Sequence, residues 1–500
     1  MPNKTGTFLH SSYKLWLALA RWVAPAAVVV SLSGGLWSQA APNPDLKSSM
    51  ASNAIPPERL NQYETLAVNW MQEYLRIDTT NPPGNEATAV AFFKRILDEE
   101  GIENQTFEYR PGRGNIWARL PATVPNPKRP FIMLSHMDVV TSDPSQWKVP
   151  PFSAEIVDGV MYGRGAQDMK SEGLAHLVVL TMLKREKVPL DRDIIFLATS
   201  DEEVDDSGTD WMIANHRELL ENAEFLITEG GENPLVDKKV KYIGLDVAEK
   251  SPFWLHLVAN GKPGHGSRPN PESAPNRLVQ ALSRVQSYQT EIKVIPVMEE
   301  FMRQLAPMQP PSLAPKFRDI RRAMKDPGFR EMISQDESLN FLFRNTVSLT
   351  MMAGSGQTNV IPPQAWANLD VRLLPGEDPT KFLEKIRQVV ADPNVTVTPL
   401  KDSFEVANAS PMDTELFRSI RTVMAHYYPG APVVPRLSGG YTENQRFRQL
   451  GVVSYGFSPF TATEEEGASE HGNNERIRVE EVKHGPKVLY DVVVELAGAE

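Results

Sequence analysis

The sequence predicts an α/β fold with a mostly parallel sheet flanked by helices, interrupted by an inserted α+β domain. The first observation behind this prediction is a set of three short apolar runs, at residues 131–135, 194–198 and 225–228, each bounded by polar residues. Runs of this length are typical of buried strands in a parallel sheet. The second observation is a change of composition near residue 253, where β-forming residues dominate, followed by a return of the α/β pattern from about residue 410.

Helix and strand signals divide the chain of 500 residues into five predicted segments. These are residues 1–40, a Pro/Ser/Asn-rich flexible tether at 41–57, the first part of the α/β domain at 58–248, the inserted domain at 249–405 with an extra helical stretch at about 282–340, and the second part of the α/β domain at 406–500. Within them, the patterns predict helices at 64–76, 87–100, 171–185, 380–391 and 414–427, and strands at 346–352, 365–373 and 452–457.

The first forty residues have the organisation of a secretory signal peptide. Lys4, Lys14 and Arg21 precede an apolar stretch at residues 22–36, and Ser38-Gln39-Ala40 places small residues at the −3 and −1 positions of a cleavage site. We therefore expect export to a bacterial periplasm or the extracellular space, with no stable membrane span after cleavage. An uncleaved N-terminal anchor is the alternative, although Arg21 interrupts the longer apolar run.

Composition excludes several classes of function. The chain has 52 Lys and Arg against 63 Asp and Glu, a formal net charge of −11, and no basic block, which argues against binding to nucleic acid or to an anionic membrane. It contains no cysteine, so disulfides, cysteine nucleophiles and thiolate zinc sites are excluded. Any zinc must be held by histidine and carboxylate side chains.

Acidic residues and one histidine follow the three apolar runs directly. His136 and Asp138 come after the first run, Glu202 and Glu203 after the second, and Glu229 after the third. In open α/β sheets the ligand crevice lies beyond the carboxyl ends of the strands, so these side chains are expected to converge. Buried carboxylates that converge repel each other unless a cation neutralises them. The arrangement therefore predicts a metal site.

Several of the candidate residues along the chain have a second interpretation. Asp168 ends a glycine-rich turn before a predicted helix, and its sequence position alone favours a helix N-cap. Glu202, Glu203 and Glu229 each fit a solvated acidic turn, and His471 fits a surface loop. If His136 is a ligand, the Asp138 carboxylate is placed to hold its second ring nitrogen.

The complete set of motifs resembles the di-zinc metallopeptidase family of aminoacylase, acetylornithine deacetylase, succinyl-diaminopimelate desuccinylase, carnosinase and glutamate carboxypeptidase, and is most similar to the carboxypeptidase S-like branch. The resemblance extends from residue 58 to the C-terminus. It is carried by Ser135-His136-Met137-Asp138-Val139-Val140, Trp147 to Phe152, Tyr162-Gly163-Arg164-Gly165-Ala166 with Asp168-Met169-Lys170, Asp201-Glu202-Glu203, Glu229-Gly230, Gly264-His265-Gly266-Ser267-Arg268-Pro269, Asn359-Val360-Ile361-Pro362, Asp370-Val371-Arg372, and His471 with Asn474-Glu475.

The resemblance implies a zinc-peptidase catalytic domain with two Zn²⁺ ions, for which Co²⁺ or Mn²⁺ could substitute. Asp168 would bridge the ions, His136 and Glu229 would complete one site, and Glu203 and His471 the other. Glu202 would be the general base acting on a metal-bridging water, and Asp138 would orient His136.

The inserted domain would be a lid or dimerisation domain. The resemblance implies that its His265 donates a hydrogen bond to the tetrahedral oxyanion, and that Asn359 and Arg372 bind substrate. An ion pair with Asp370 is the alternative role of Arg372. Gly440 lies in a substrate-binding segment, residues 438–443, that departs from the family pattern. The family pattern also has two glycines after the position of Lys170, where this chain has Ser171-Glu172-Gly173.

We therefore expect a zinc-dependent hydrolase of a peptide or N-acyl amide bond next to a free carboxylate: a carboxypeptidase, dipeptidase or N-acyl-amino-acid amidohydrolase. A catalytically silent ligand-binding or scaffold relative of the same fold is the alternative, and retention of Glu202 beside all five ligand positions speaks against it. A serine hydrolase lacks support because Gly-x-Ser-x-Gly is absent. The lid could form a homodimer or act in cis.

Overall fold

The computed structural model describes residues 50–401 and 406–499. The chain divides into two compact units: the first comprises the residues up to Gly244, Met412–Val433 and those from Gly451 onward, and the second Leu245–Pro411 and Val434–Leu450. The predicted signal peptide and residues 41–49 of the predicted tether lie outside the described residues.

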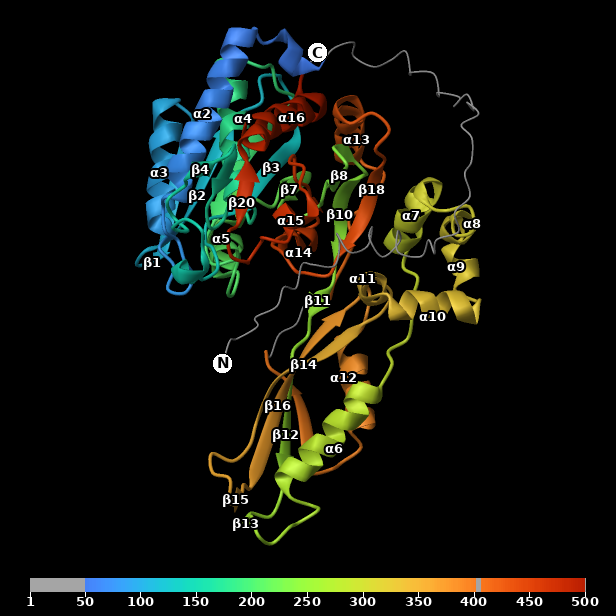
Figure 1. Cartoon of the computed structure of the whole chain (residues 1–500). Coiled ribbons are helices and arrows are strands. Elements are labelled where there is room, and N and C mark those ends of the chain that lie inside the picture. Colours follow the sequence, from blue (N-terminus) through green and yellow to red (C-terminus); the bar gives the residue numbers. More distant parts are fainter. Residues whose placement is uncertain (1–49, 402–405, 500) are drawn as a thin grey trace. The chain divides into compact units, whose positions relative to one another are not determined.

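The first unit is an α/β domain (Figure 1). Its helices are η1 (Ala51–Ala54), α2 (Pro57–Leu75), α3 (Glu86–Glu99), η2 (Pro144–Gln146), α4 (Lys170–Arg185), α5 (Ser207–Asn215), η3 (Arg217–Leu219), α13 (Glu415–Tyr427), α15 (Glu464–Gly467) and α16 (Val479–Ala497). Its strands are β1 (Glu103–Arg110), β2 (Arg113–Leu120), β3 (Lys128–His136), β4 (Ile156–Val157), β5 (Val160–Tyr162), β6 (Arg192–Thr199), β7 (Phe225–Thr228), β8 (Leu235–Val236), β9 (Lys239–Val240), β19 (Val453–Gly456) and β20 (Arg476–Arg478).

The main sheet has the strand order β1-β2-β6-β3-β7-β19-β10-β18, and the chain passes from the first to the second unit in β10 (Ile243–Glu249) and again in β18 (Val433–Ser438). The three predicted apolar strands are confirmed as its neighbours β6, β3 and β7, which are parallel to one another. Their register pairs His136, at the end of β3, with Thr199, at the end of β6. The residues after these strands therefore leave the sheet at the same edge.

Helix α4 packs onto the sheet from its first turn. Every residue from Lys170 to Leu183 is buried, and the helix contacts β3, β6, α2 and α16. Gly173 permits this close approach, because a Cβ there would lie 2.8 Å from Ser135 Oγ on β3. The start of α4 is thereby fixed beside the end of β3.

The second unit contains an antiparallel sheet in which β14 pairs with β16, and β16 with β11 and β12. Alternate residues of β16, from Ala365 to Leu373, pack with α6 and α12 in one apolar core. Its strands are β11 (Ser251–Pro252), β12 (Leu255–Asn260), β13 (Gly264–His265), β14 (Thr346–Ala353), β15 (Val360–Ile361), β16 (Gln364–Leu373) and β17 (Val395–Pro399). Its helices are α6 (Ala274–Ser287), α7 (Pro296–Leu305), η4 (Ala306–Met308), α8 (Ala314–Arg318), α9 (Ile320–Ala323), α10 (Pro327–Gln335), α11 (Glu337–Asn340), η5 (Phe341–Phe343), α12 (Pro379–Val390) and α14 (Asn444–Gln449).

The predicted helices and strands are confirmed, and apart from the start of one helix their ends differ by only a few residues. The helix expected from residue 64 begins earlier, at Pro57, because proline is compatible with the first turn of a helix. The end of the expected tether differs from the prediction. Ser52 is buried in η1, where its main-chain N–H and hydroxyl donate to Asp491 on α16, each at 2.7 Å. Among the described residues, no helix combines the length and apolar character that crossing a membrane requires.

Candidate metal centre

Asp168 lies between two imidazole–carboxylate pairs of the first unit. Its Oδ1 is 2.9 Å from His136 Nε2, which is 3.4 Å from Glu229 Oε2. Its Oδ2 is 2.7 Å from His471 Nε2, which is 3.2 Å from Glu203 Oε2. The five predicted ligands therefore converge, and the two oxygens of one carboxylate face different pairs.

His136 ends β3 and is completely buried. Its Nδ1 lies 3.0 Å from the main-chain oxygen of Asp138 but 3.7 Å from the carboxylate of the same residue. The acceptor that holds the ring is thus the carbonyl, which differs from the expected carboxylate. The Asp138 carboxylate instead accepts the main-chain N–H groups of Glu202, at 3.1 Å, and Glu203, at 3.2 Å.

Asp168 is not the N-cap of the following helix, in contrast to what sequence position alone favoured. The N-cap of α4 is Met169, which makes no side-chain cap hydrogen bond. The turn that carries Asp168 is stabilised by Glu475, a residue distant in the sequence. The Glu475 carboxylate accepts hydrogen bonds from the main-chain N–H groups of Gly165 at 2.9 Å, Gln167 at 2.7 Å and Asp168 at 3.1 Å. The Asp168 side chain is therefore left to face the two histidines.

Glu202 and Glu203 lie in the turn after β6. In this turn Asp201 has a φ of 72°, a left-handed conformation that is uncommon for residues other than glycine. His471, in a different loop, has the same type of conformation with a φ of 54°. Glu203 Oε1 is buried without a hydrogen-bond partner. Ligand atoms of Glu202, His136 and Glu229 lie within 4.8 Å of one another, so Glu202 adjoins the cluster.

The cluster carries an excess of negative charge. Burial, followed by the charge of Asp168, raises the pKa of Glu229 to about 8, and burial with the charge of Glu229 raises that of Glu202 well above its usual range. Burial alone would lower the pKa of His471, but hydrogen bonds and charges of Asp168 and Glu203 raise it to about 12. Without a cation, protons are the remaining means of neutralising this charge.

These residues fit divalent metal ions. An unpartnered buried oxygen, a carboxylate facing two imidazoles and excess negative charge are all relieved when cations bind. Imidazole nitrogen and carboxylate oxygen are ligands that suit zinc, cobalt and manganese.

The candidate residues of the second unit form a separate set. His265 and Asn359 are brought together: β13 pairs with β15, and Gly266 N–H donates to Asn359 O at 2.7 Å. Arg372 Nε lies 2.9 Å from Asp370 Oδ1, the ion pair considered as an alternative from the sequence. Gly440 N–H donates to Ser438 Oγ at 3.0 Å.

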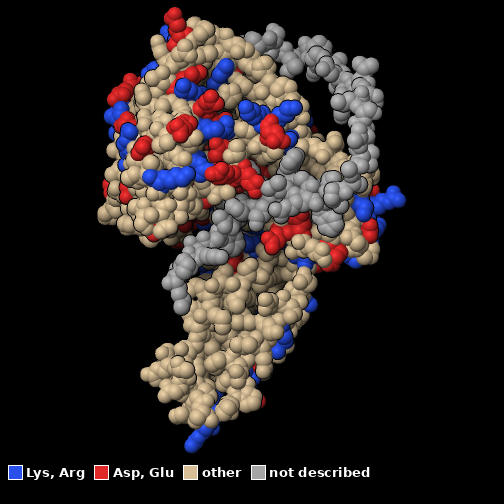
Figure 2. Space-filling model, viewed as in Figure 1, with Lys and Arg blue, Asp and Glu red and all other residues tan. Residues whose placement is uncertain are grey.

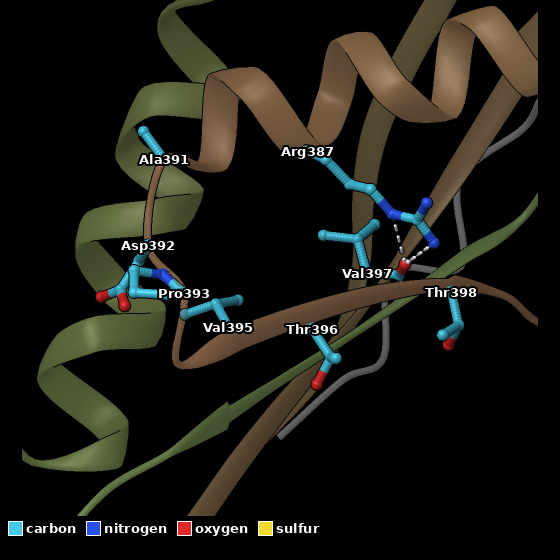
Figure 3. A pocket seen from close by; sticks show the side chains of 8 residues that line it. All are labelled: Arg387, Ala391, Asp392, Pro393, Val395, Thr396, Val397 and Thr398. Carbon is cyan, nitrogen blue, oxygen red and sulfur yellow. Dashed lines mark hydrogen bonds between the residues drawn. The ribbon is translucent and has the colours of Figure 1, made fainter.

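A hollow of about 490 Å³ in the second unit lies between the end of α12 and β17 (Figure 3). Its Arg387 donates from Nε and Nη2 to the main-chain oxygen of Val397, at 3.1 and 2.9 Å. None of the candidate site residues lines this hollow.

Sequence reasoning missed the residues that hold the ligand-bearing loops. Arg164 and Glu475 were recognised only as motif positions, and Asn81 was not singled out; the signal for it was its place in Asn81-Pro82-Pro83-Gly84, a run typical of a fixed turn. Glu172, in the segment that departs from the two glycines of the family pattern, is only 5% exposed. Burial and the charges of Glu229 and Asp168 raise its pKa well above the usual range.

Comparison with known proteins shows the family of this chain. The model of the peptidase family M20/M25/M40 matches residues 132–495. The chain belongs to this family. It is 30% identical over 372 residues to the N-fatty-acyl-amino acid synthase/hydrolase PM20D1 of Xenopus tropicalis, covering 71% of this chain and 70% of that protein. It is 26% identical over 442 residues to aminoacylase-1B of Rattus norvegicus, covering 86% and 95%.

The fold is also that of the M20 family. The crystal structure of the M20 metallo-carboxypeptidase Sso-CP2 from Sulfolobus solfataricus matches with a TM-score of 0.64 at 19% identity, covering 86% of this chain and 98% of that one. Family membership, these relatives and the converging ligands together make this M20 protein a metal-dependent hydrolase of amide bonds.

Proposed function

We propose that this protein uses two divalent metal ions to hydrolyse a peptide or N-acyl amide bond adjacent to a free carboxylate. The observation that carries the proposal is Asp168, whose two oxygens face the His136–Glu229 pair and the His471–Glu203 pair. Zinc is the first choice of metal, with cobalt or manganese as substitutes. When bound, such ions polarise the scissile carbonyl and lower the pKa of water.

Glu202 is the general base. It adjoins the ligands His136 and Glu229, and the Asp138 carboxylate holds its main-chain N–H. Its raised pKa, caused first by burial, suits a group that takes a proton from the attacking water and delivers it to the leaving amine nitrogen. With Glu203 among the ligands, the two adjacent glutamates have different roles.

His265 supplies a hydrogen bond to the oxyanion. Its Nδ1 accepts the main-chain N–H of Ser267 at 3.1 Å, so the ring proton resides on Nε2. The exposed ring therefore presents a donor, and Asn359 directly precedes β15, the strand that pairs with the His265 strand. Arg372, with Asp370 as its present partner, binds the substrate carboxylate. Gly440 offers main-chain contacts to the rest of the substrate.

A substrate panel tests the proposal. The zinc-loaded protein is assayed against dipeptides, N-acetyl amino acids and long-chain N-acyl amino acids, each with its carboxylate free or amidated. We expect hydrolysis of at least one free-carboxylate class and about tenfold or greater loss on amidation. Binding without hydrolysis across the panel would leave the silent ligand-binding alternative in place and refute the proposal.

Association through the second unit is also part of the proposal. Among the described residues β14 has β16 as its strand partner, and it exposes Leu349, Met351 and Met352 by 49%, 54% and 57%. Few charged side chains surround the sheet of this unit in the view of Figure 2. These features support a homodimer through this edge.

Light scattering should give the mass of a dimer for the wild type and of a monomer for Met351→Lys. A monomeric wild type would contradict the proposed homodimer.

Export rests on residues 1–40, outside the described residues. We expect the mature protein in the periplasm or medium to begin near residue 41, as N-terminal sequencing of the fractionated protein would show. An intact N-terminus would instead support an anchor.

A further inference from the structure

One side-chain amide lies between two buried carboxylates next to the metal centre. Asn81 Nδ2 is 2.8 Å from Asp138 Oδ2 and 2.7 Å from Asp201 Oδ1. Asn81 is 4% exposed, Asp138 0% and Asp201 5%. A primary amide carries two N–H donors on one nitrogen, so Asn81 provides one to each carboxylate.

These two carboxylates shape the turn that carries Glu202 and Glu203. The Asp138 carboxylate accepts the main-chain N–H of both glutamates. Asp201 directly precedes them, in the left-handed conformation with a φ of 72°. Two buried anions at this place would repel each other and drive the turn apart unless donors are shared between them.

The position of Asn81 is itself fixed. Its main-chain N–H donates to Val139 O at 2.9 Å, which places it beside the segment carrying Asp138. On its other side, Arg113 donates from Nη1 to Pro83 O at 2.9 Å and lies 2.7 Å from Asp201 Oδ1. Gly84 leaves the space for Arg113, because a Cβ there would lie 2.4 Å from its Cζ.

Arg113 neutralises Asp201 and also pairs with the buried Glu86, whose Oε2 is 2.6 Å from Arg113 Nε. No Lys or Arg pairs with Asp138 among the ion pairs of the described residues. Its carboxylate depends on the two main-chain N–H groups and on the amide of Asn81. The amide therefore joins a carboxylate that is paired with an arginine to one whose nearest ion-pair partner is the imidazole of His136, at 3.7 Å.

We infer that Asn81 is a positioning residue: by joining Asp138 to Asp201 it fixes the main chain of Glu202 and Glu203, and so the general base and one metal ligand. The inference deepens the proposed function and rests on it for the role of Glu202. Its consequence for Glu203 concerns metal binding and needs no assumption about the substrate.

A graded series of variants tests this inference. Asn81→Ser keeps one donor, whereas Asn81→Leu has none and Asn81→Asp adds a third carboxylate. We expect kcat to fall by about 10- to 100-fold in Asn81→Leu and Asn81→Asp, with KM within about threefold of wild type and a smaller loss in Asn81→Ser. Calorimetric titration with Zn²⁺ should show a parallel weakening of one of the two sites.

Tyr427→Phe is the matched control. It removes a 2.5 Å hydrogen bond to buried Asp491 in the same unit, without touching the turn. We expect it to lower the unfolding temperature and leave kcat and zinc affinity unchanged. The inference is overturned if the zinc affinity and kcat of Asn81→Leu stay within about twofold of the wild-type values. It is also overturned if Asn81→Leu and Tyr427→Phe lower the unfolding temperature equally and lower zinc affinity and kcat equally. Should Asn81→Leu not fold, Asn81→Ser decides by the same criteria.

Failure of the proposed function has a different signature. If the wild type hydrolyses no member of the substrate panel, that function fails, and the zinc titration of the Asn81 series still tests this inference alone.

Discussion

Arg164 Nη1 lies 2.6 Å from Glu475 Oε2, with both side chains at most 2% exposed. This buried ion pair joins two loops that are far apart in the sequence and that carry Asp168 and His471. Arg164 also donates to the main-chain oxygen of Gly472 at 2.9 Å, next to His471. The loops of Asp168 and His471 are therefore held together by an ion pair that lies outside the proposed ligand set.

Breaking this pair should be costly. Glu475→Gln leaves the buried charge of Arg164 uncompensated, and we expect a loss of about 3–5 kcal/mol in the free energy of unfolding together with weaker zinc binding. Urea unfolding and zinc titration measure the two effects. Glu465→Gln is the control: this 87% exposed residue pairs with Arg476 in the same region, and its loss should cost at most about 1 kcal/mol. Equal effects of both substitutions would contradict the assignment.

Glu202→Gln should separate metal binding from catalysis. The amide keeps the shape of the side chain but cannot take up a proton, so kcat should fall by about 10²- to 10⁴-fold while the zinc content stays that of the wild type. Single-turnover kinetics and elemental analysis check this. Glu218→Gln, an exposed residue of η3, should leave both unchanged. Near-normal turnover in Glu202→Gln would remove this residue from the mechanism.

Metal removal should reveal protons bound by the ligands. In the metal-free protein burial and the charge of Asp168 raise the pKa of Glu229 to about 8, so its carboxyl is largely protonated at neutral pH. Metal binding needs the carboxylate, and therefore proton release should accompany zinc uptake and zinc affinity should rise from about pH 6 to pH 8. Calorimetry in buffers of different ionisation enthalpy measures this release, and the contribution of Glu229 should vanish near pH 9.

A chelator should abolish activity, and added Zn²⁺ should restore it. Hydrolysis that is insensitive to the chelator would contradict the metal assignment.

Lys250 should make the stability of the second unit depend on pH. Burial, with the charge of Arg372, lowers its pKa to about 7, while its Nζ donates to Phe341 O at 3.0 Å and Arg344 O at 2.9 Å. An unfolded lysine keeps its proton up to about pH 10. Between these values the unfolded chain binds the extra proton, so stability should rise with pH.

Lys250→Met should remove that slope, as unfolding temperatures measured between about pH 7 and pH 10 will show. Lys381→Met, at a side chain 83% exposed, should keep the wild-type slope. Equal slopes for wild type and Lys250→Met would contradict the assignment.

The sequence by itself determined the sheet strands and the convergence of the proposed metal ligands. Apolar runs of strand length specify β3, β6 and β7, because only buried strands are apolar on both faces. Parallel strands end at one edge, so the polar residues after them had to converge. Asp168 and His471 do not follow any of these apolar runs. Only their sequence motifs predicted that they belong to the same group.

Tertiary structure decided what holds the ligands. That the carbonyl and not the carboxylate of Asp138 contacts His136 depends on the path of the turn after β3. The bonds from Asn81 to Asp138 and from Arg164 to Glu475 span 57 and 311 residues of sequence. Their partners are chosen by packing: a buried polar group must bond to whatever donor or acceptor the fold brings to it, and local sequence does not encode that neighbour.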